Sequence, residues 1–283
     1  MTELDKAINA YKDDIASESL RGKIEGRKFV SPTLYQIKRP IAQMRNAPVR
    51  DAEHVSQALA GEFFDTYEIK NGFAWGQLKR DDYVGYLSID DIDATIKPST
   101  HKIAVMRTNA YSGPKVQFQI NANLTFGALV RASDRRENGY VWCEGFGYIY
   151  ENHLCEIDKK WGDPVALAQE FIGTPYVWGG NSPLGVDCSG LVQVCFGACG
   201  IELPRDARLQ EAQGQAISIK NDLSGLKRGD LVFWKGHVAI MLDEANLIHA
   251  TAFTMMVSIE RLENVKTRID AVGIPIRAIK RVY

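Results

Sequence analysis

The residues whose chemistry stands out are one cysteine, Cys188, and two histidines, His237 and His249. Cys188 follows a glycine-rich turn and begins an apolar run that stops at Gly200, which predicts a helix starting at the cysteine and ending at a glycine C-cap. The unpaired N–H groups and the positive dipole end at a helix N-terminus stabilise a thiolate. We therefore expect a lowered pKa for this thiol and a nucleophilic sulfur near neutral pH.

A nucleophilic thiol needs a base, and both histidines fall in predicted strands. His237 lies in the apolar run GHVAIML, His249 lies in the run NLIHA, and residues 243–246 between them have the composition of a hairpin loop. Histidines on neighbouring strands can share a hydrogen bond. The pattern predicts Cys188 as nucleophile, His237 as general base and His249 as the residue that orients the base, which is the arrangement of acyl-transfer enzymes.

The elements around these residues follow an α+β order. Helical spacing begins at Pro164 and ends at Gly173; the nucleophile turn and helix follow, and then a run of strands reaches the C-terminus. Helices followed by an antiparallel sheet are typical of an α+β domain. We place this domain at residues 164–283, after a linker at 159–163.

Residues 164–260 resemble the catalytic domain of the NlpC-type cysteine peptidases, a papain-like family that acts on bacterial cell-wall peptides. Several ordered motifs carry this resemblance: YVWGG (176–180), DCSGL (187–191), LPRDA (203–207), KRGDLVFW (227–234), GHVAI (236–240) and IHA (248–250). The resemblance implies a papain-like fold in which helices pack on an antiparallel sheet. It also implies that Tyr176 supports the oxyanion site, where its hydroxyl would act together with the Cys188 backbone N–H.

The residues beside the nucleophile have two interpretations. Asp187 and Ser189 suit the N-cap of the nucleophile helix. In the family members that carry SH3-like domains, the matching residues bind the free α-amine of an N-terminal L-alanine, for which a carboxylate is a suitable partner. In LPRDA, Arg205 and Asp206 are candidates to line the substrate groove, whereas Ala207 has no side-chain group for a hydrogen bond to substrate.

Short alternating strands precede the linker, at 63–69, 73–79 and 83–89, and predict a small antiparallel barrel. A second copy of the same template begins near residue 101, which indicates an internal repeat of about 55 residues. Both copies resemble bacterial SH3-like domains, and we place them at 43–97 and 98–158.

The first SH3-like domain is also expected to contribute to the substrate site. In the family it supplies a glutamate and a tyrosine, which correspond here to Glu62 and Tyr83. Ala60 departs from the family pattern, which often has tyrosine at that position, and a solvated strand-edge carboxylate is the alternative interpretation of Glu62. Residues 1–42 are expected to form a helix over 3–21 followed by an irregular segment.

The composition excludes several classes of function. The 283 residues are 45% hydrophobic and 24% charged with a net charge of −1, so the chain lacks the basic surface of nucleic-acid or anionic-membrane binding proteins. The N-terminus has no secretory signal pattern, and no apolar run approaches the roughly 20 residues that span a bilayer. We therefore expect a cytoplasmic location. No phosphate-loop or metal motif occurs, so we expect no metal and no organic cofactor. No obligate protein partner is evident from the sequence.

Five cysteines form an odd set without a C-x-x-C pair. Four of them are predicted to be buried reduced thiols: Cys143, Cys155, Cys195 and Cys199.

The resemblance implies a cysteine endopeptidase that cuts murein tri- or tetrapeptides between γ-D-glutamate and the diamino acid, either diaminopimelate or lysine. A requirement for a free N-terminal L-Ala suits the recycling of cell-wall peptides inside the cell. Two alternatives stay open. One is a peptidoglycan-binding module, whose wall binding would survive Cys188→Ala. The other is a thiol acyltransferase or amidase on a different substrate, because a triad does not fix its substrate.

Overall fold

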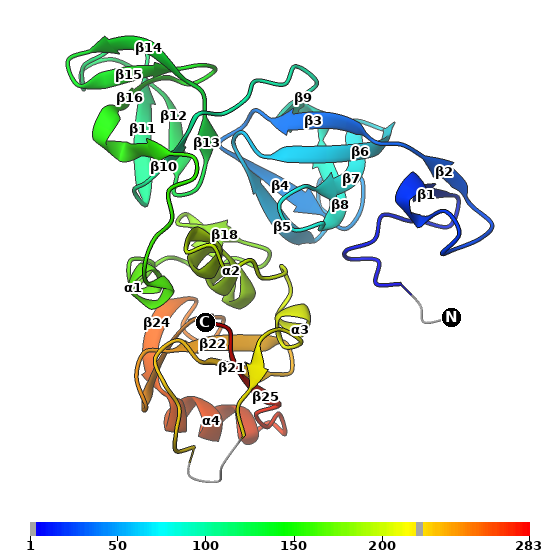
Figure 1. Ribbon diagram of the computed structural model, residues 1–283, viewed down its shortest axis with the longest axis vertical. Coiled ribbons are helices and arrows are strands. Elements are labelled where there is room, and N and C mark those ends of the chain that lie inside the picture. The colour runs from blue at the N-terminus through cyan, green and yellow to red at the C-terminus, as the bar shows by residue number, and fades with distance from the viewer. Residues whose placement is uncertain (1–3, 219–222) are drawn as a thin grey trace. The chain divides into compact units, whose positions relative to one another are not determined.

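The computed structural model describes residues 4–218 and 223–283, and the chain divides into two compact units, Met1–Asp158 and Lys159–Tyr283. Each unit has its own sheets (Figure 1) and its own buried cores. Among the described residues, no helix is long and apolar enough to cross a membrane.

The first unit consists mainly of short antiparallel strands. Its largest sheet has the strand order β5-β4-β8-β7-β6-β3-β9, and alternate apolar residues of these strands form one core around Met44 and Phe64. The strands predicted at 63–69, 73–79 and 83–89 are confirmed as β6, β7 and β8. The seven strands are β3 (Thr33–Ile37), β4 (Ile41–Arg45), β5 (His54–Leu59), β6 (Phe63–Lys70), β7 (Phe73–Leu78), β8 (Val84–Ser88) and β9 (Ile92–Asp93).

A second group of strands in the same unit has a separate core. This core is closed by Leu59 and Ala60 at the end of β5, and the Leu129 N–H donates to the Ala60 carbonyl at 2.8 Å. The two groups of strands therefore share both apolar and backbone contacts. The second group comprises β10 (His101–Ile103), β11 (Arg107–Tyr111), β12 (Ile120–Thr125), β13 (Leu129–Val130), β14 (Ala132–Glu137), β15 (Tyr140–Cys143), β16 (Gly147–Tyr150) and β17 (Leu154–Glu156).

The helix predicted over residues 3–21 is wrong. The segment contains β1 (Ile15–Ser17), which pairs in parallel with β2 (Lys28–Val30), and a short 3-10 turn, η1 (Glu18–Leu20), lies between them. Its backbone hydrogen bonds do not follow a helical pattern: the Ser17 N–H donates to the Ala10 carbonyl, the Lys12 N–H donates to the Ile15 carbonyl, and the Ala7 carbonyl accepts from the Val84 N–H. The expectation of an irregular segment up to residue 42 is also wrong, because β2, β3 and the start of β4 lie there.

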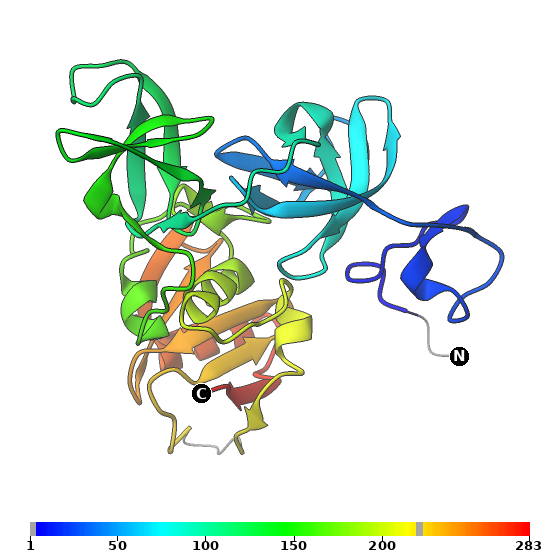
Figure 2. The ribbon, with the colours of Figure 1, turned by 45° about the horizontal axis from the view of Figure 1, so that its top comes forward.

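The second unit places helices on a six-stranded antiparallel sheet of order β20-β25-β21-β22-β23-β24. Helix α2 (Cys188–Ala198) lies on one side of this sheet and α4 (Leu262–Asp270) lies on the other, as Figures 1 and 2 show. The remaining elements are α1 (Pro164–Gln169), β18 (Asn181–Ser182), β19 (Gly185–Val186), α3 (Ala207–Gln210), β20 (Gln215–Ala216), β21 (Leu231–Trp234), β22 (His237–Met241), β23 (Asn246–Thr251), β24 (Met256–Arg261) and β25 (Ala278–Arg281).

All five cysteines are free thiols. Cys143 and Cys195 are buried as predicted, whereas Cys155 and Cys199 are only half-buried. Full burial is therefore wrong for these two.

Candidate active site

The nucleophile helix is confirmed. Asp187 is its N-cap and accepts a hydrogen bond from the Gly190 N–H at 2.7 Å, so α2 begins at Cys188. The helix ends at Ala198, and Gly200 has a φ of 84°, the left-handed conformation expected of a glycine that follows a helix. The cysteine thus lies in the first turn of a capped helix.

Gly190 is required by a close backbone approach. A Cβ atom at this position would lie 2.1 Å from the Gly180 carbonyl oxygen, whereas a Cβ on Gly197 in the same helix would meet nothing within 4 Å. The two glycines therefore have opposite consequences when replaced by alanine.

We expect Gly190→Ala to lower the free energy of unfolding by about 1–3 kcal/mol, because the helix and the Gly180 turn must separate. Gly197→Ala is the matched control and should raise stability by about 0.4–1 kcal/mol, because alanine favours a helix interior. Urea unfolding of both variants measures this. Equal stability of the two variants would contradict the close approach.

The environment of the Cys188 sulfur differs from our expectation. The residue is buried at 7% exposure, and its sulfur interacts with the backbone N–H groups of Val238 and Ser189. Burial raises the pKa of this thiol above its usual range, and the Asp187 carboxylate raises it further; the two N–H groups oppose the shift without cancelling it. The predicted lowering of the thiol pKa is therefore wrong, because desolvation outweighs the helix terminus.

The two histidines meet as predicted. β22 and β23 are antiparallel neighbours, and the His237 Nε2 and His249 Nδ1 atoms are 2.9 Å apart. Burial lowers the pKa of His237, and the neighbouring His249 lowers it further. Burial likewise lowers the pKa of His249. These pKa shifts favour a neutral thiol and neutral imidazoles in the resting site.

The neutral protonation state of the Cys188 thiol predicts how its alkylation by iodoacetamide depends on pH. Because only the thiolate reacts, the rate should still rise about tenfold per pH unit between pH 7 and 9. The measurement is the mass of the Cys188 peptide over time, with Cys188→Ala giving the background from other thiols. A rate that is already constant from pH 5 upward would show a preformed thiolate–imidazolium pair and contradict this state.

Sequence reasoning missed Glu260 and Arg268. The His249 Nε2 atom lies 2.9 Å from Glu260 Oε2, and Arg268 donates to both Glu260 oxygens at 2.8 and 2.9 Å. Arg268 belongs to α4, and its guanidinium lies 3.8 Å from the centre of the Phe253 ring. The alternation of side chains along β24 predicts which face of the sheet Glu260 occupies. Only the register, in which Glu260 pairs with Leu247 of β23, shows that its carboxylate reaches His249.

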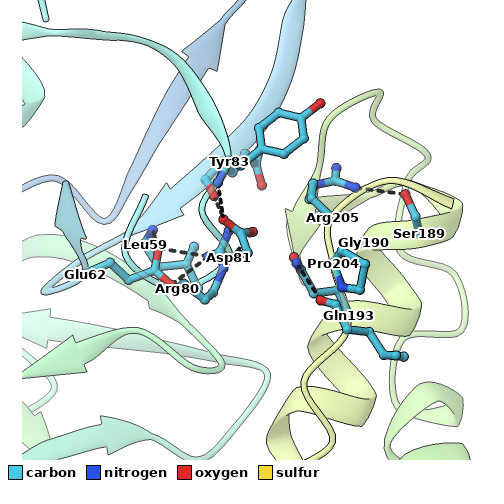
Figure 3. Close-up of polar contacts among 12 residues, drawn as sticks. Leu59, Glu62, Arg80, Asp81, Tyr83, Ser189, Gly190, Gln193, Pro204 and Arg205 are labelled. Atoms are coloured by element: carbon cyan, nitrogen blue, oxygen red, sulfur yellow. Dashed lines mark hydrogen bonds and ion pairs between the residues drawn. The ribbon is translucent and has the colours of Figure 1, made fainter. Parts of the chain in front are cut away.

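Asp187 and Ser189 are engaged within the chain. Arg205, which is 1% exposed, donates to the two Asp187 oxygens at 2.9 and 2.6 Å. It also donates to the Ser189 hydroxyl at 3.0 Å (Figure 3). Asp187 also accepts from the Gly179 N–H at 2.9 Å. With the Gly190 bond, these contacts occupy the usual acceptor sites of a carboxylate. The geometry favours the N-cap interpretation of Asp187, and its role as a direct ligand of substrate stays a prediction.

The other predicted residues of this unit lie around the same loops. Burial raises the pKa of Tyr176, so its phenol keeps the proton that an oxyanion donor needs. Asp206 precedes α3 and accepts from Arg208 at 3.2 Å. Gln210 ties this loop to α2, because its amide donates to the carbonyls of Ser189 and Pro204. The roles of Tyr176, Arg205 and Asp206 toward substrate stay predictions.

In the first unit, Glu62 belongs to a charged cluster. Arg80 donates to both Glu62 oxygens at 2.6 and 2.8 Å and to Asp81 at 3.1 Å, and the Leu59 N–H donates to Glu62 at 2.8 Å (Figure 3). The Tyr83 N–H donates to Asp81 at 3.2 Å, and Tyr83 is 7% exposed. The carboxylates of Glu62 and Asp81 and the guanidinium of Arg80 give this cluster a formal charge of −1. The side chain of Glu62 is 12% exposed, so the solvated alternative is wrong.

Two family models match separate parts of the chain. Residues 173–273 match the NlpC/P60 family, and residues 44–92 match the bacterial dipeptidyl-peptidase SH3 domain. The chain carries an NlpC/P60 domain. NlpC/P60 proteins are cysteine peptidases, so the site built on Cys188 belongs to a peptidase domain. The papain-like fold with an SH3 domain is thereby confirmed, whereas the second SH3-like domain, residues 98–158, stays a prediction.

The proteins similar to this chain include named peptidases. Dipeptidyl-peptidase 6 of Lysinibacillus sphaericus is 28% identical over 222 residues, which are 68% of this chain and 80% of that protein. A gamma-D-glutamyl-L-lysine dipeptidyl-peptidase of Bacillus subtilis is 31% identical over 129 residues, which are 41% of this chain and 42% of that protein. A crystal structure of an NlpC/P60 family protein from Bacillus cereus superposes with a TM-score of 0.71 at 18% identity, covering 88% of this chain and 99% of that one, and shows the shared fold.

Proposed function

We propose that this NlpC/P60 protein is a cysteine endopeptidase that hydrolyses murein-derived peptides at the bond between γ-D-glutamate and the diamino acid. The observation that carries the proposal is the Cys188 thiol at the start of α2, beside the strand whose His237 is hydrogen-bonded to His249 at 2.9 Å. The choice of bond is supported by the relatives named gamma-D-glutamyl-L-lysine dipeptidyl-peptidases.

In this mechanism the Cys188 sulfur attacks the γ-carbonyl carbon while His237 takes the thiol proton. The oxyanion accepts hydrogen bonds from the Cys188 backbone N–H and the Tyr176 hydroxyl. Collapse breaks the C–N bond, His237 protonates the departing amine, and a thioester is left on Cys188. Water, deprotonated by His237, then attacks the thioester and restores the thiol.

We further propose that the enzyme requires a free N-terminal L-Ala. Glu62 and Tyr83, together with Asp187 and Ser189, would recognise the ammonium group, and Arg205 and Asp206 would line the groove. The family resemblance and the net negative charge of the Glu62–Arg80–Asp81 cluster support this assignment. Stem peptides still attached to muramic acid have no such ammonium. This selectivity suits peptide recycling, for which we propose a cytoplasmic location.

The test uses L-Ala-γ-D-Glu-diaminopimelate, its lysine counterpart and their N-acetylated forms, with products read by mass spectrometry. The proposal predicts release of the dipeptide L-Ala-D-Glu from the free-amine peptides only. Cleavage of the acetylated forms at the same rate would remove the amine requirement. Absence of cleavage in all four peptides would overturn the peptidase assignment and favour a transferase or a binding module.

Glu62→Gln should raise KM for the free-amine peptide by about 10-fold or more, because one carboxylate of the proposed ammonium site loses its charge. Glu53→Gln is the matched control, since Glu53 is an exposed carboxylate of the same unit that accepts from the Asn46 amide at 3.1 Å. An unchanged KM in Glu62→Gln would remove Glu62 from the substrate site.

A further inference from the structure

Hydrogen bonds continue behind the base beyond His249. The path runs from His237 Nε2 to His249 Nδ1, and from His249 Nε2 to Glu260 Oε2, with 2.9 Å at each step. Arg268 then holds both Glu260 oxygens. His249 is 1% exposed, so water does not offer its ring alternative partners.

The direction of each hydrogen bond follows from what each group can donate. Glu260 is ionised, because the hydrogen bonds from Arg268 hold its pKa below the usual range, and a carboxylate only accepts. His249 must therefore carry its proton on Nε2. A neutral imidazole has one N–H, so His249 Nδ1 is an acceptor and His237 Nε2 must donate to it. The remaining nitrogen, His237 Nδ1, is left with its lone pair.

We propose that Glu260, held by Arg268, is a positioning residue that sets the tautomers of His249 and His237 and thereby makes Nδ1 of His237 the basic nitrogen. The tautomers follow from this unit alone, and their catalytic consequence rests on the proposed function. When His237 takes the thiol proton on Nδ1, it keeps donating through Nε2, so no hydrogen bond has to reverse during attack.

The fixed position of the carboxylate is part of the proposal. Arg268 reaches Glu260 from α4, while His249 reaches it from β23, so the carboxylate is held from both elements. Glu260 and Arg268 are the charged groups that shift the pKa values of both rings, and the Cys188 thiol is the titratable group on the other side of His237 in the proposed mechanism. A guanidinium stacked on Phe253 adds a further restraint on the donor geometry.

The experiment compares Glu260→Leu with Glu260→Gln. Leucine removes the acceptor. Glutamine keeps one oxygen, and that oxygen is best placed at the Oε2 position, where both His249 and Arg268 donate. Glu263→Gln on α4 is the matched control, since Glu263 is exposed. The readouts are the ring-nitrogen resonances of 15N-histidine-labelled full-length protein, kcat and KM for L-Ala-γ-D-Glu-diaminopimelate, and thermal unfolding.

The wild type should show Nε2–H tautomers for both histidines. In Glu260→Leu these tautomers should become mixed and kcat should fall by about 10–100-fold with KM nearly unchanged, the effect typical of losing an orienting partner. Glu260→Gln and Glu263→Gln should keep the wild-type tautomers, and kcat should fall less than fivefold in the former. If Glu260→Leu fails to fold, the wild-type spectrum decides: an Nδ1–H proton on His249 overturns the proposal.

Wild-type tautomers and wild-type kcat in a folded Glu260→Leu protein would also overturn the proposal. Failure of the proposed function can be distinguished from failure of this proposal. In the former case the wild type would not cleave the peptide, while the nitrogen resonances would still report the tautomers.

Discussion

Cys188→Ala should lower kcat for L-Ala-γ-D-Glu-diaminopimelate by at least about 10⁴-fold. Without the sulfur no thioester forms, and His237 has no thiol to activate. KM should change little, because alanine fits the buried site at the start of α2. The measurement is the initial rate of diaminopimelate release by wild type and variant at equal concentration.

Cys199→Ala is the control for this substitution, because Cys199 is a half-buried thiol at the other end of the same helix. It should retain the wild-type rate. Hydrolysis by Cys188→Ala within tenfold of the wild type, in protein free of wild-type contamination, would remove the thiol from the mechanism.

Arg205→Met should lower the free energy of unfolding by about 3–5 kcal/mol, because it leaves the Asp187 carboxylate buried without its cation. Arg205 is 1% exposed, and its two terminal nitrogens donate to both carboxylate oxygens of Asp187, the N-cap of α2. The N-terminus of α2 should loosen, so activity should fall together with stability. Urea unfolding of the full chain gives the first quantity.

Arg208→Met is the matched control, because Arg208 is exposed and its contact with Asp206 is a surface pair. Its effect on stability should stay within about 0.5 kcal/mol. If the two variants were equally stable, the buried pair would not support the nucleophile helix.

The nucleophile region could be predicted because its signals are local. The N-cap and the Gly-rich turn come shortly before Cys188, the glycine that ends the helix comes twelve residues after it, and each has one dominant physical interpretation. The pairing of the two histidines could also be predicted, since a short loop between two apolar runs makes the two strands antiparallel neighbours. The motifs then identified the family that the comparisons confirm.

The N-terminal segment could not be predicted from spacing. Its apolar residues suit a helix, yet Ala10 and Ile15 pack near Trp75, whereas Tyr11, Ala16 and Leu20 form a different cluster. The single apolar face of a helix cannot pack into two separate clusters. Backbone hydrogen bonds within the segment, to β2 and to Val84 replace those of a helix, and the sequence does not show these partners.

The electrostatics of the site depended on burial, which spacing does not reveal. The helix terminus alone would lower the pKa of Cys188, but the surrounding protein removes the sulfur from water and raises it. The same limit hid Glu260, whose contact with His249 depends on the register of β24. Asp187 was recognised as a cap, but its buried partner, Arg205, lies 18 residues further along the chain.

The central claim is that the peptide bond breaks by way of a γ-glutamyl thioester on Cys188. The most direct measurement is cleavage of L-Ala-γ-D-Glu-diaminopimelate in the presence of hydroxylamine, with products separated by mass spectrometry. Attack of hydroxylamine on the thioester releases the thiol and gives the γ-hydroxamate of L-Ala-D-Glu, so the account predicts this product alongside the free acid. Cleavage that gives only the free acid at every hydroxylamine concentration would contradict a thioester on Cys188.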